Sequence, residues 1–147
     1  MLVLDREHLL EINALGAKVY PYEGCGLLLG EIVEGDNVIK ALYPTENRWA
    51  VEEEKRERFN IMPEDMLQAE LAAMTRDLEV IGVFHSHPDC DPVASPRDLV
   101  WAAWAGYSYL ITAVRNAQPE ESRSWQLLPD RSGFIEETIQ ITNALRR

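Results

Sequence analysis

Residues 85–98 of the chain read HSHPDCDPVASPRD and contain two of its three histidines, His85 and His87. The five residues before them, VIGVF, are apolar and rich in β-branched side chains, which predicts a buried strand. Because side chains alternate across a strand, we expect Ile81, Val83 and both histidines on one face, with the histidines side by side where the strand ends. Two imidazoles in that relation can reach one metal ion, and imidazole is a suitable ligand for zinc.

The residues that follow predict a loop and then a helix. Pro88 and Pro92 interrupt the strand, and Ser95 with Pro96 predicts a helix start, with serine at the N-cap and proline in the first turn. Asp98 then falls in the first turn, where its carboxylate can point back to the loop. Two histidines and one carboxylate leave a fourth tetrahedral position for water, as in catalytic zinc sites. Ser-x-x-Asp is also a common capping pattern without chemistry, and paired histidines also occur without metal; capping and catalysis are compatible.

A second informative segment lies upstream, where residues 21–30 read PYEGCGLLLG and place Glu23 between a predicted helix end and an apolar, glycine-rich strand. With residues 85–98, this segment resembles the signature of the JAMM (MPN+) metalloprotease family. That signature combines a glutamate in Glu-x-Cys-Gly-Leu-Leu-x-Gly with His-Ser/Thr-His, seven residues, Ser, two residues and Asp. The histidine part matches without departure, and weaker similarity covers nearly the whole chain. The chain is most similar to the short, stand-alone prokaryotic members.

The resemblance implies a function and the residues that perform it. His85, His87 and Asp98 would bind one zinc ion, and zinc-activated water would attack the substrate. Glu23 would take the water's proton and pass it to the leaving amine, and Ser95 would stabilise the oxyanion. A role for Ser95 as covalent nucleophile is disfavoured, because both neighbouring histidines would already bind the metal. The chain would therefore be a zinc metalloprotease, a hydrolase of the isopeptidase type.

The resemblance also implies a substrate class. Enzymes of the family cleave the bond after the C-terminal Gly-Gly of a ubiquitin-fold protein, and for short prokaryotic members the implied substrates are ubiquitin-like or sulfur-carrier proteins. A Gly-Gly tail suits a site between a strand end and a helix start, because only a narrow, extended chain could enter it. The sequence identifies neither the carrier nor the leaving group. It also leaves the oligomeric state open, a homodimer included.

Length and composition set further bounds. The 147 residues, 46% of them hydrophobic, fit one globular domain over residues 1–147. No apolar run approaches the ~20 residues of a membrane helix, and the N-terminal stretch MLVLDR is too short and too soon acidic for a signal peptide, so we expect a cytoplasmic protein with no membrane partner. A net charge of −11 argues against nucleic-acid binding, which needs a basic surface. Cys25 and Cys90 form no Cys-x-x-Cys motif, and a disulfide between them stays open.

The element pattern predicts an α+β fold in which a mixed, curved, barrel-like sheet is flanked by helices on its two sides. The family resemblance implies the same JAB/MPN-like arrangement, with a cytidine-deaminase-like layering. In the second predicted helix, Leu67, Leu71 and Met74 form an apolar stripe that we expect to pack in the core. We predict strands over residues 1–4, 25–29, 38–43, 59–61, 80–84, 107–114, 124–128 and 133–135, and helices over residues 5–19, 63–78 and 95–106.

Other functions fit parts of the sequence. His-x-His-x-Asp also begins the signature of metallo-β-lactamase-like hydrolases, but Cys90 stands where that signature needs a histidine, and no later histidine completes two metal sites. A TIM-barrel amidohydrolase would need ~250 residues. A non-catalytic MPN-type scaffold, which only mediates assembly, would lack the ligands that are all present here. A general zinc peptidase remains a further alternative.

Overall fold

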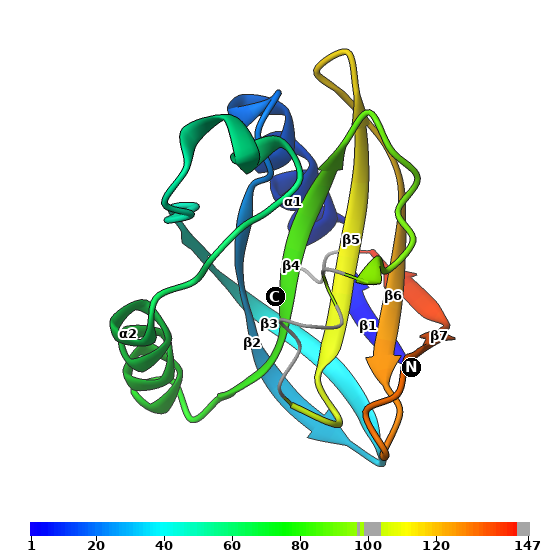
Figure 1. Cartoon of the computed structure of the whole chain (residues 1–147). Coiled ribbons are helices and arrows are strands. Elements are labelled where there is room, and N and C mark those ends of the chain that lie inside the picture. The colour runs from blue at the N-terminus through cyan, green and yellow to red at the C-terminus, as the bar shows by residue number, and fades with distance from the viewer. Residues whose placement is uncertain (97, 99–103, 144–147) are drawn as a thin grey trace.

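The computed structural model describes residues 1–96, 98 and 104–143. Within these residues the chain forms an eight-stranded mixed sheet and two α-helices, which confirms the predicted α+β class (Figure 1). None of the helices described is long and apolar enough to cross a membrane. In sheet order the strands are β7 (Phe134–Glu137), β6 (Gln118–Leu127), β5 (Ser108–Arg115), β4 (Glu79–Pro88), β2 (Cys25–Val33), β3 (Asp36–Thr45), β1 (Leu2–Asp5) and β8 (Ile139–Thr142). The helices are α1 (Arg6–Val19), α2 (Pro63–Met74) and a short 3-10 helix, η1 (Glu52–Arg56).

The sheet curls until its two edge strands meet. β7 pairs with β6 at one edge and β8 pairs in parallel with β1 at the other, yet only Thr138 separates β7 from β8 in the chain. The backbone N–H of Leu2 donates to the carbonyl of Thr138 over 2.9 Å, which ties this connection to β1. The sheet is therefore a nearly closed barrel, as the sequence predicted.

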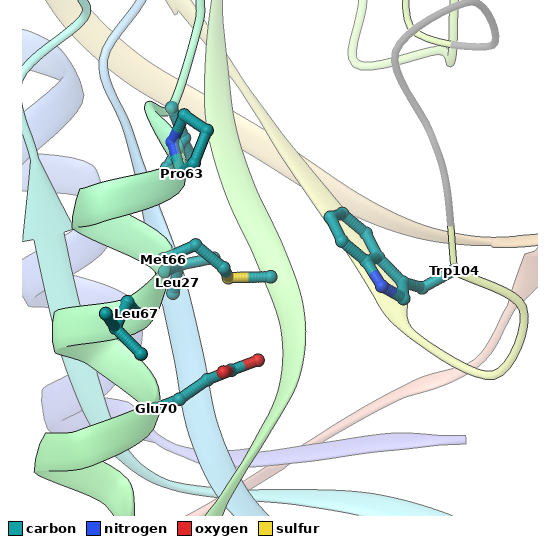
Figure 2. Close-up of a pocket in the computed structure, with 7 residues that line it drawn as sticks. Leu27, Pro63, Met66, Leu67, Glu70 and Trp104 are labelled. Carbon is teal, nitrogen blue, oxygen red and sulfur yellow. The ribbon is translucent and has the colours of Figure 1, made fainter.

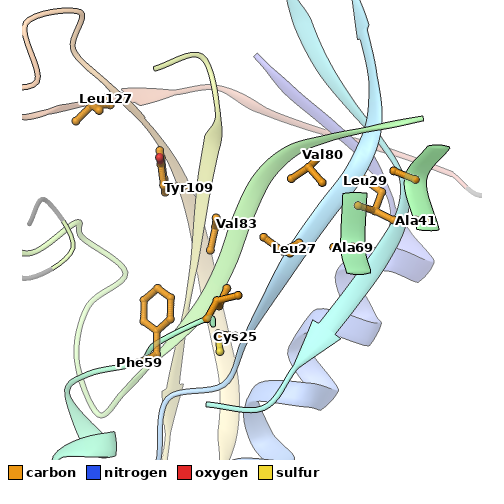
Figure 3. Close-up of a cluster of buried hydrophobic side chains, with 12 residues drawn as sticks. Cys25, Leu27, Leu29, Ala41, Phe59, Ala69, Val80, Val83, Tyr109 and Leu127 are labelled. Carbon is orange, nitrogen blue, oxygen red and sulfur yellow. The ribbon is translucent and has the colours of Figure 1, made fainter. Parts of the chain in front are cut away.

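The two helices pack against opposite faces of the sheet. Along β2, Leu27 belongs to a buried cluster that includes Ala69 and Ala73 of α2, whereas its neighbour Leu28 belongs to a cluster that includes Ile12 of α1. Successive strand residues point to opposite faces, so the two clusters lie on the two sides of the sheet. Figure 3 shows the α2-side cluster, where labelled side chains line the same side of β2 and β4.

Helix α1 leads the chain from the first strand to Glu23. The Asp5 carboxylate accepts a hydrogen bond from the backbone N–H of His8 over 2.8 Å, the expected N-cap contact. The helix ends at Val19, and the Tyr20–Pro21 peptide bond is cis. The chain then turns directly into β2, so the helix end and the sheet together fix the backbone of Glu23.

The apolar stripe of α2 is not where the sequence predicted. Leu67, Leu71 and Met74 are 53%, 46% and 68% exposed, and the buried residues of the helix are Ala69 and Ala73. The small alanine side chains bring the helix backbone close to the sheet and leave the longer side chains outside. The expectation that this stripe packs in the core was wrong, and so was the predicted end at residue 78, since the helix stops at Met74.

The segment between η1 and α2 was predicted to be a strand and is not one. Residues 59–61 are irregular, although Phe59 and Ile61 are only 6% and 7% exposed. The carbonyl of Asn60 accepts a hydrogen bond from the backbone N–H of Arg48 over 3.1 Å. The segment therefore lies over the α2-side face as a buried loop, and this covering loop is what encloses the histidines described next.

Candidate metal centre

Strand β4 does not end before the histidines. It runs to Pro88, and its parallel pairing with β5 continues through His87 opposite Ala113. His85 and His87 are 2% and 7% exposed. The expectation that they leave the end of the strand was wrong, because β5 extends the sheet beside them. Both rings therefore project from a backbone that is paired with β5 in the sheet.

A β-bulge in β4 changes which residues share the histidine face. Leu28 pairs with Gly82 and Leu29 with Val80, so Ile81 has no partner on β2. Ile81 packs in the α1-side cluster, whereas Val83 packs in the α2-side cluster. The prediction that Ile81 shares a face with the histidines was wrong, because the extra residue reverses the alternation before Gly82. The face with Val83 and both histidines is the α2 side.

The donor atoms of His85, His87 and Asp98 converge on one point. The two Nε2 atoms are 3.2 Å apart, and the Asp98 carboxylate oxygens lie 3.1 Å from Nε2 of His85 and 3.4 Å from Nε2 of His87. Zinc–nitrogen and zinc–oxygen bonds of about 2.0–2.1 Å at the tetrahedral angle would separate neighbouring ligand atoms by roughly 3.3 Å. The three side chains therefore have the spacing of three corners of a tetrahedral zinc site.

Hydrogen bonds and burial prepare both rings as ligands. Nδ1 of His87 lies 2.9 Å from the carbonyl oxygen of Asp91, and because a carbonyl only accepts, Nδ1 carries the proton and Nε2 keeps its lone pair. The ring of His85 stacks on Phe59, with centroids 4.5 Å apart. Burial lowers the pKa of His85, which favours the neutral, ligand-competent ring. The contact with Asp91 thus directs the Nε2 lone pair of His87 toward the convergence point, and the Nε2 atom of His85 lies 3.2 Å from that of His87.

Asp98 is held by the start of a helix. Its carboxylate accepts from the backbone N–H of Ser95 over 2.7 Å, and its own N–H donates to Ser95 Oγ over 3.2 Å, so the predicted capping contact is present. Burial opposes ionisation of Asp98, but the nearby His85 and the hydrogen bonds to this carboxylate outweigh it and hold its pKa below the usual range. Pro96 and Asp98 are helical, and residues 97 and 99–103 lie outside the described residues. Residues 104–106 are not helical, so the prediction that the helix reaches residue 106 was wrong.

Glu23 lies on the same face as the histidines, two residues before β2 begins at Cys25. The backbone N–H of Ser86 donates to the carbonyl of Gly24 over 3.0 Å, which continues the pairing of β2 with β4, and the N–H of Gly24 donates to the Ser86 hydroxyl oxygen over 2.8 Å. By this register Glu23 is opposite His87, and its side chain is on the face of the two rings. The glutamate is only 5% exposed. Its N–H donates to the carbonyl of Lys55 over 2.7 Å.

The sequence did not single out Asn47, which ties the covering loop to the site. Its amide nitrogen donates to the carbonyls of Glu23 and Arg58, at 3.0 and 2.9 Å. Its amide oxygen accepts from the backbone N–H groups of Trp49 and Asn60, at 3.1 and 3.3 Å. An asparagine just after a predicted strand is an ordinary turn signal, so the sequence alone offers nothing that marks this one out.

The two cysteines do not form a nucleophilic pair. Both are free; Cys25 is buried and Cys90 is exposed. Burial raises the pKa of the Cys25 thiol to about 12, and burial also raises that of Cys90. Because the thiolate is the reactive form, neither side chain is activated for attack at neutral pH.

Proteins that are similar to this chain include two desampylases and several solved structures. A desampylase of Haloferax volcanii is 35% identical over 91 residues, which are 62% of this chain and 62% of that protein. A desampylase of Pyrococcus furiosus is 49% identical over 41 residues, 28% of this chain and 29% of that one. The matches thus span less than two thirds of the length of either relative.

The similar structures cover almost the whole chain. A protein of Desulfitobacterium hafniense is 28% identical with a TM-score of 0.85, covering 99% of this chain and 95% of that one. A protein of Salinibacter ruber is 38% identical with a TM-score of 0.75, covering 98% and 95%. A third structure, described as JAMM, a metalloprotease-like zinc site in the proteasome and signalosome, shares the fold at 17% identity, with a TM-score of 0.58 and coverage of 97% and 99%.

The family match agrees with these similarities and with the position of the histidines. Residues 5–128 match Prok-JAB, the prokaryotic homologs of the JAB domain. This range begins at the N-cap of α1 and includes both Glu23 and the His85–Asp98 cluster. The chain therefore belongs to the prokaryotic JAB-domain family, among the short prokaryotic members of the JAMM/MPN proteins.

Proposed function

We propose that this chain is a zinc-dependent isopeptidase that hydrolyses the bond after the C-terminal Gly-Gly of a ubiquitin-like or sulfur-carrier protein. The observation that carries the proposal is the convergence of two buried imidazoles and one carboxylate at distances of 3.1–3.4 Å. The desampylase relatives support the reaction class, since that name describes removal of an attached group. The JAMM structure described as a zinc site supports the choice of metal.

The donor set fits zinc. His85, His87 and Asp98 would supply two nitrogen ligands and one oxygen ligand, a combination that zinc accepts, and would leave one position open. A zinc ion held by these three residues would supply a water whose pKa is lowered toward ~7 and a Lewis acid for the scissile carbonyl. The protein's part is to hold the His87 ring in one tautomer and to keep the Asp98 carboxylate ionised, which the contacts of these two residues favour.

Glu23 is the proposed general acid and base. It takes a proton from the attacking water and delivers it to the leaving amine. Three features support this role: its place opposite His87, its burial beside the ligands, and a backbone held from both sides by Lys55 and Asn47. A backbone fixed in this way lets the carboxylate meet the water and then the amine without a large rearrangement.

Ser95 is the proposed donor to the oxyanion. Its oxygen accepts from the N–H of Asp98, and this contact does not use the hydroxyl proton, so the hydroxyl can donate to substrate. We expect Ser95→Ala to lower kcat by about 10²–10³-fold, the usual effect of removing one oxyanion donor, while zinc stays bound.

Ser95→Thr is the matched control, because threonine keeps both the cap and a hydroxyl. It should retain more activity than the alanine variant, measured by steady-state cleavage alongside zinc content. Near-normal turnover of Ser95→Ala would remove this residue from the mechanism.

The proposed function is tested with a carrier fusion. A ubiquitin-like carrier from the source organism is joined through its Gly-Gly end to a reporter protein and incubated with the zinc-loaded chain. We expect cleavage after the second glycine, loss of cleavage with a chelator, and recovery on adding zinc. Equal cleavage of unstructured peptides with bulky residues at that position would indicate a general peptidase. Failure to cleave any such carrier, with zinc bound, would favour a scaffold.

A further inference from the structure

Ser86 lies between the two histidines in the chain, and its side chain faces away from their rings. Because side chains alternate along β4, the hydroxyl is on the α1 side of the sheet, whereas the rings of His85 and His87 are on the α2 side. A Cβ atom at Gly16 of α1 would lie 3.2 Å from the Cβ of Ser86, so the helix covers this side chain directly. The residue is only 3% exposed. Its hydroxyl is therefore separated by the sheet from any substrate that reaches the rings.

The hydroxyl of Ser86 bonds instead to the backbone next to Glu23. The N–H of Gly24 donates to Ser86 Oγ over 2.8 Å, and the N–H of Ser86 donates to the carbonyl of Gly24 over 3.0 Å. In a regular antiparallel pair both bonds would join backbone groups. Here a side-chain oxygen on the α1 side is the acceptor of one of them, so the N–H of Gly24 is directed out of the sheet toward α1.

The same peptide unit is held at its other end. The N–H of Gly24 and the carbonyl of Glu23 belong to one trans peptide group, in which they point in opposite directions. That carbonyl accepts a hydrogen bond from the amide nitrogen of Asn47 over 3.0 Å, and Asn47 in turn accepts from the N–H of Asn60 in the covering loop. Two side chains on opposite sides of this peptide thus fix the rotation of its plane.

The rotation of this plane determines where the Glu23 side chain points. The peptide after Glu23 defines its ψ angle, and the peptide before it, which defines φ, is held by the hydrogen bond from the N–H of Glu23 to the carbonyl of Lys55 over 2.7 Å. With both planes fixed, the Cα–Cβ bond of Glu23 has one direction. A group that moves a proton must be held within about 0.5 Å of its productive position, which a free peptide would not ensure.

We propose that Ser86 is a positioning residue for Glu23. Its hydroxyl holds the Glu23–Gly24 peptide from the α1 side, and this keeps the Glu23 carboxylate directed at the position that the metal ligands leave open. The inference rests on the proposed function, in which Glu23 is the general acid and base. It adds to that function a residue that contacts neither the metal nor the substrate.

The surfaces open to a substrate near the rings lie on the other side of the sheet. Figure 2 shows one of them, a groove between α2 and Trp104 that is lined by Leu27. Leu27 belongs to the α2-side cluster, and Ser86 lies behind the sheet from there. Loss of the Ser86 hydroxyl thus removes no contact with substrate, so a positioning role should change kcat and leave KM unaltered.

Ser86→Ala is the test variant. We expect kcat for the carrier fusion to fall about 10–100-fold, because a displacement of about 1 Å that originates away from the chemistry can cost up to about 100-fold. The zinc Kd should stay unchanged, since the contacts that hold His87 and Asp98 come from the Asp91 carbonyl and from Ser95. In the metal-free protein, the amide hydrogen of Gly24 should exchange with solvent at least about tenfold faster, as measured by NMR.

Thr112→Val is the matched control. Thr112 is the neighbour of Ser86 on β5, is 1% exposed, and its hydroxyl bonds to Ser122 across 2.7 Å. The variant loses a buried hydroxyl next to Ser86 without touching Gly24, so it should lower Tm and keep the wild-type kcat. Ser86→Thr keeps the hydroxyl and should retain most of kcat.

Four outcomes would overturn the inference. Wild-type kcat in Ser86→Ala would leave the proposed function standing and remove the role of Ser86. An equal loss of kcat in Thr112→Val would show that a looser sheet, not the Gly24 contact, lowers activity. A folded Ser86→Thr that is as slow as Ser86→Ala would show that the hydroxyl is not what matters. A zinc-loaded wild type that cleaves no carrier would overturn the proposed function and this role with it.

Discussion

Replacing Glu23 with glutamine is expected to lower kcat by about 10²–10⁴-fold and to leave zinc bound. Glutamine has nearly the size of glutamate and keeps the backbone contacts with Lys55 and Asn47, but it cannot take a proton. Because Glu23 lies opposite His87 and is not among the three converging side chains, the metal should not depend on it. Steady-state cleavage of the carrier fusion and zinc content of the same sample measure the two expectations.

Glu46→Gln is the matched control for this variant. Glu46 lines the same surface hollow as Glu23, but its side chain is 80% exposed and its ion-pair partner is Arg48. An exposed ion pair contributes little, so turnover and stability should both stay close to wild type. A Glu23→Gln protein that is isolated without zinc would show that the carboxylate is a ligand. Turnover equal to wild type would show that another group moves the proton.

Short-range signals predicted the parts of the fold that depend on a few neighbouring residues. Asp5 was expected to cap α1, and Ser95 to contact Asp98, and both contacts are present. Each needs only a side chain and backbone groups within one helical turn, so the pattern in the sequence nearly determines the geometry. The spacing of His85, His87 and Asp98 was informative for the same reason: two lie on one strand and the third follows one loop later.

The sequence was less informative about features of the fold that depend on pairing between strands far apart in the chain. The hydrophobic pattern of residues 80–84 does not predict the bulge at Ile81, because the bulge depends on how β4 pairs with β2. Gly82 was the available signal, since a glycine inside a strand often marks a bulge or a close approach. A Cβ at Gly82 would lie 2.1 Å from the carbonyl oxygen of Ser108 on β5, so the neighbouring strand requires glycine there.

Periodicity has a comparable limit in α2. The pattern of Leu67, Leu71 and Met74 correctly predicts that these residues share a side, but it cannot tell whether that side faces the core or a partner. Ala69 and Ala73, four residues apart, share another side of the helix. Their small side chains let the helix backbone approach the sheet closely, so this side is the one that packs against it. Which side of α2 is buried thus depends on side-chain volume, and hydropathy alone does not predict it.

Asp98→Ala is expected to lose most of the metal and, with it, nearly all activity. Removing a group that only orients a ligand typically lowers metal affinity 10–100-fold, so removing one of three ligands should cost more than about 100-fold. The two histidines that remain would still face each other but would leave two open positions. Zinc content after dialysis and competition with a chelator measure the loss directly.

Heat stability gives an independent measure of the same site. A ligand present at about 100 times its Kd stabilises the folded state by roughly 2.7 kcal/mol, which for a chain of this length raises Tm by about 5–10 °C. A chelator should therefore lower the Tm of the wild type by about that amount and leave the Tm of Asp98→Ala unchanged.

Asp91→Ala is the control for the aspartate substitution, because the Asp91 side chain is 77% exposed and pairs with Arg115, while the carbonyl that orients His87 belongs to the backbone. Its Tm should respond to the chelator as the wild type does. If Asp98→Ala still binds zinc as tightly as Asp91→Ala, then Asp98 only caps its helix, and the metal is held by the histidines with a different third ligand.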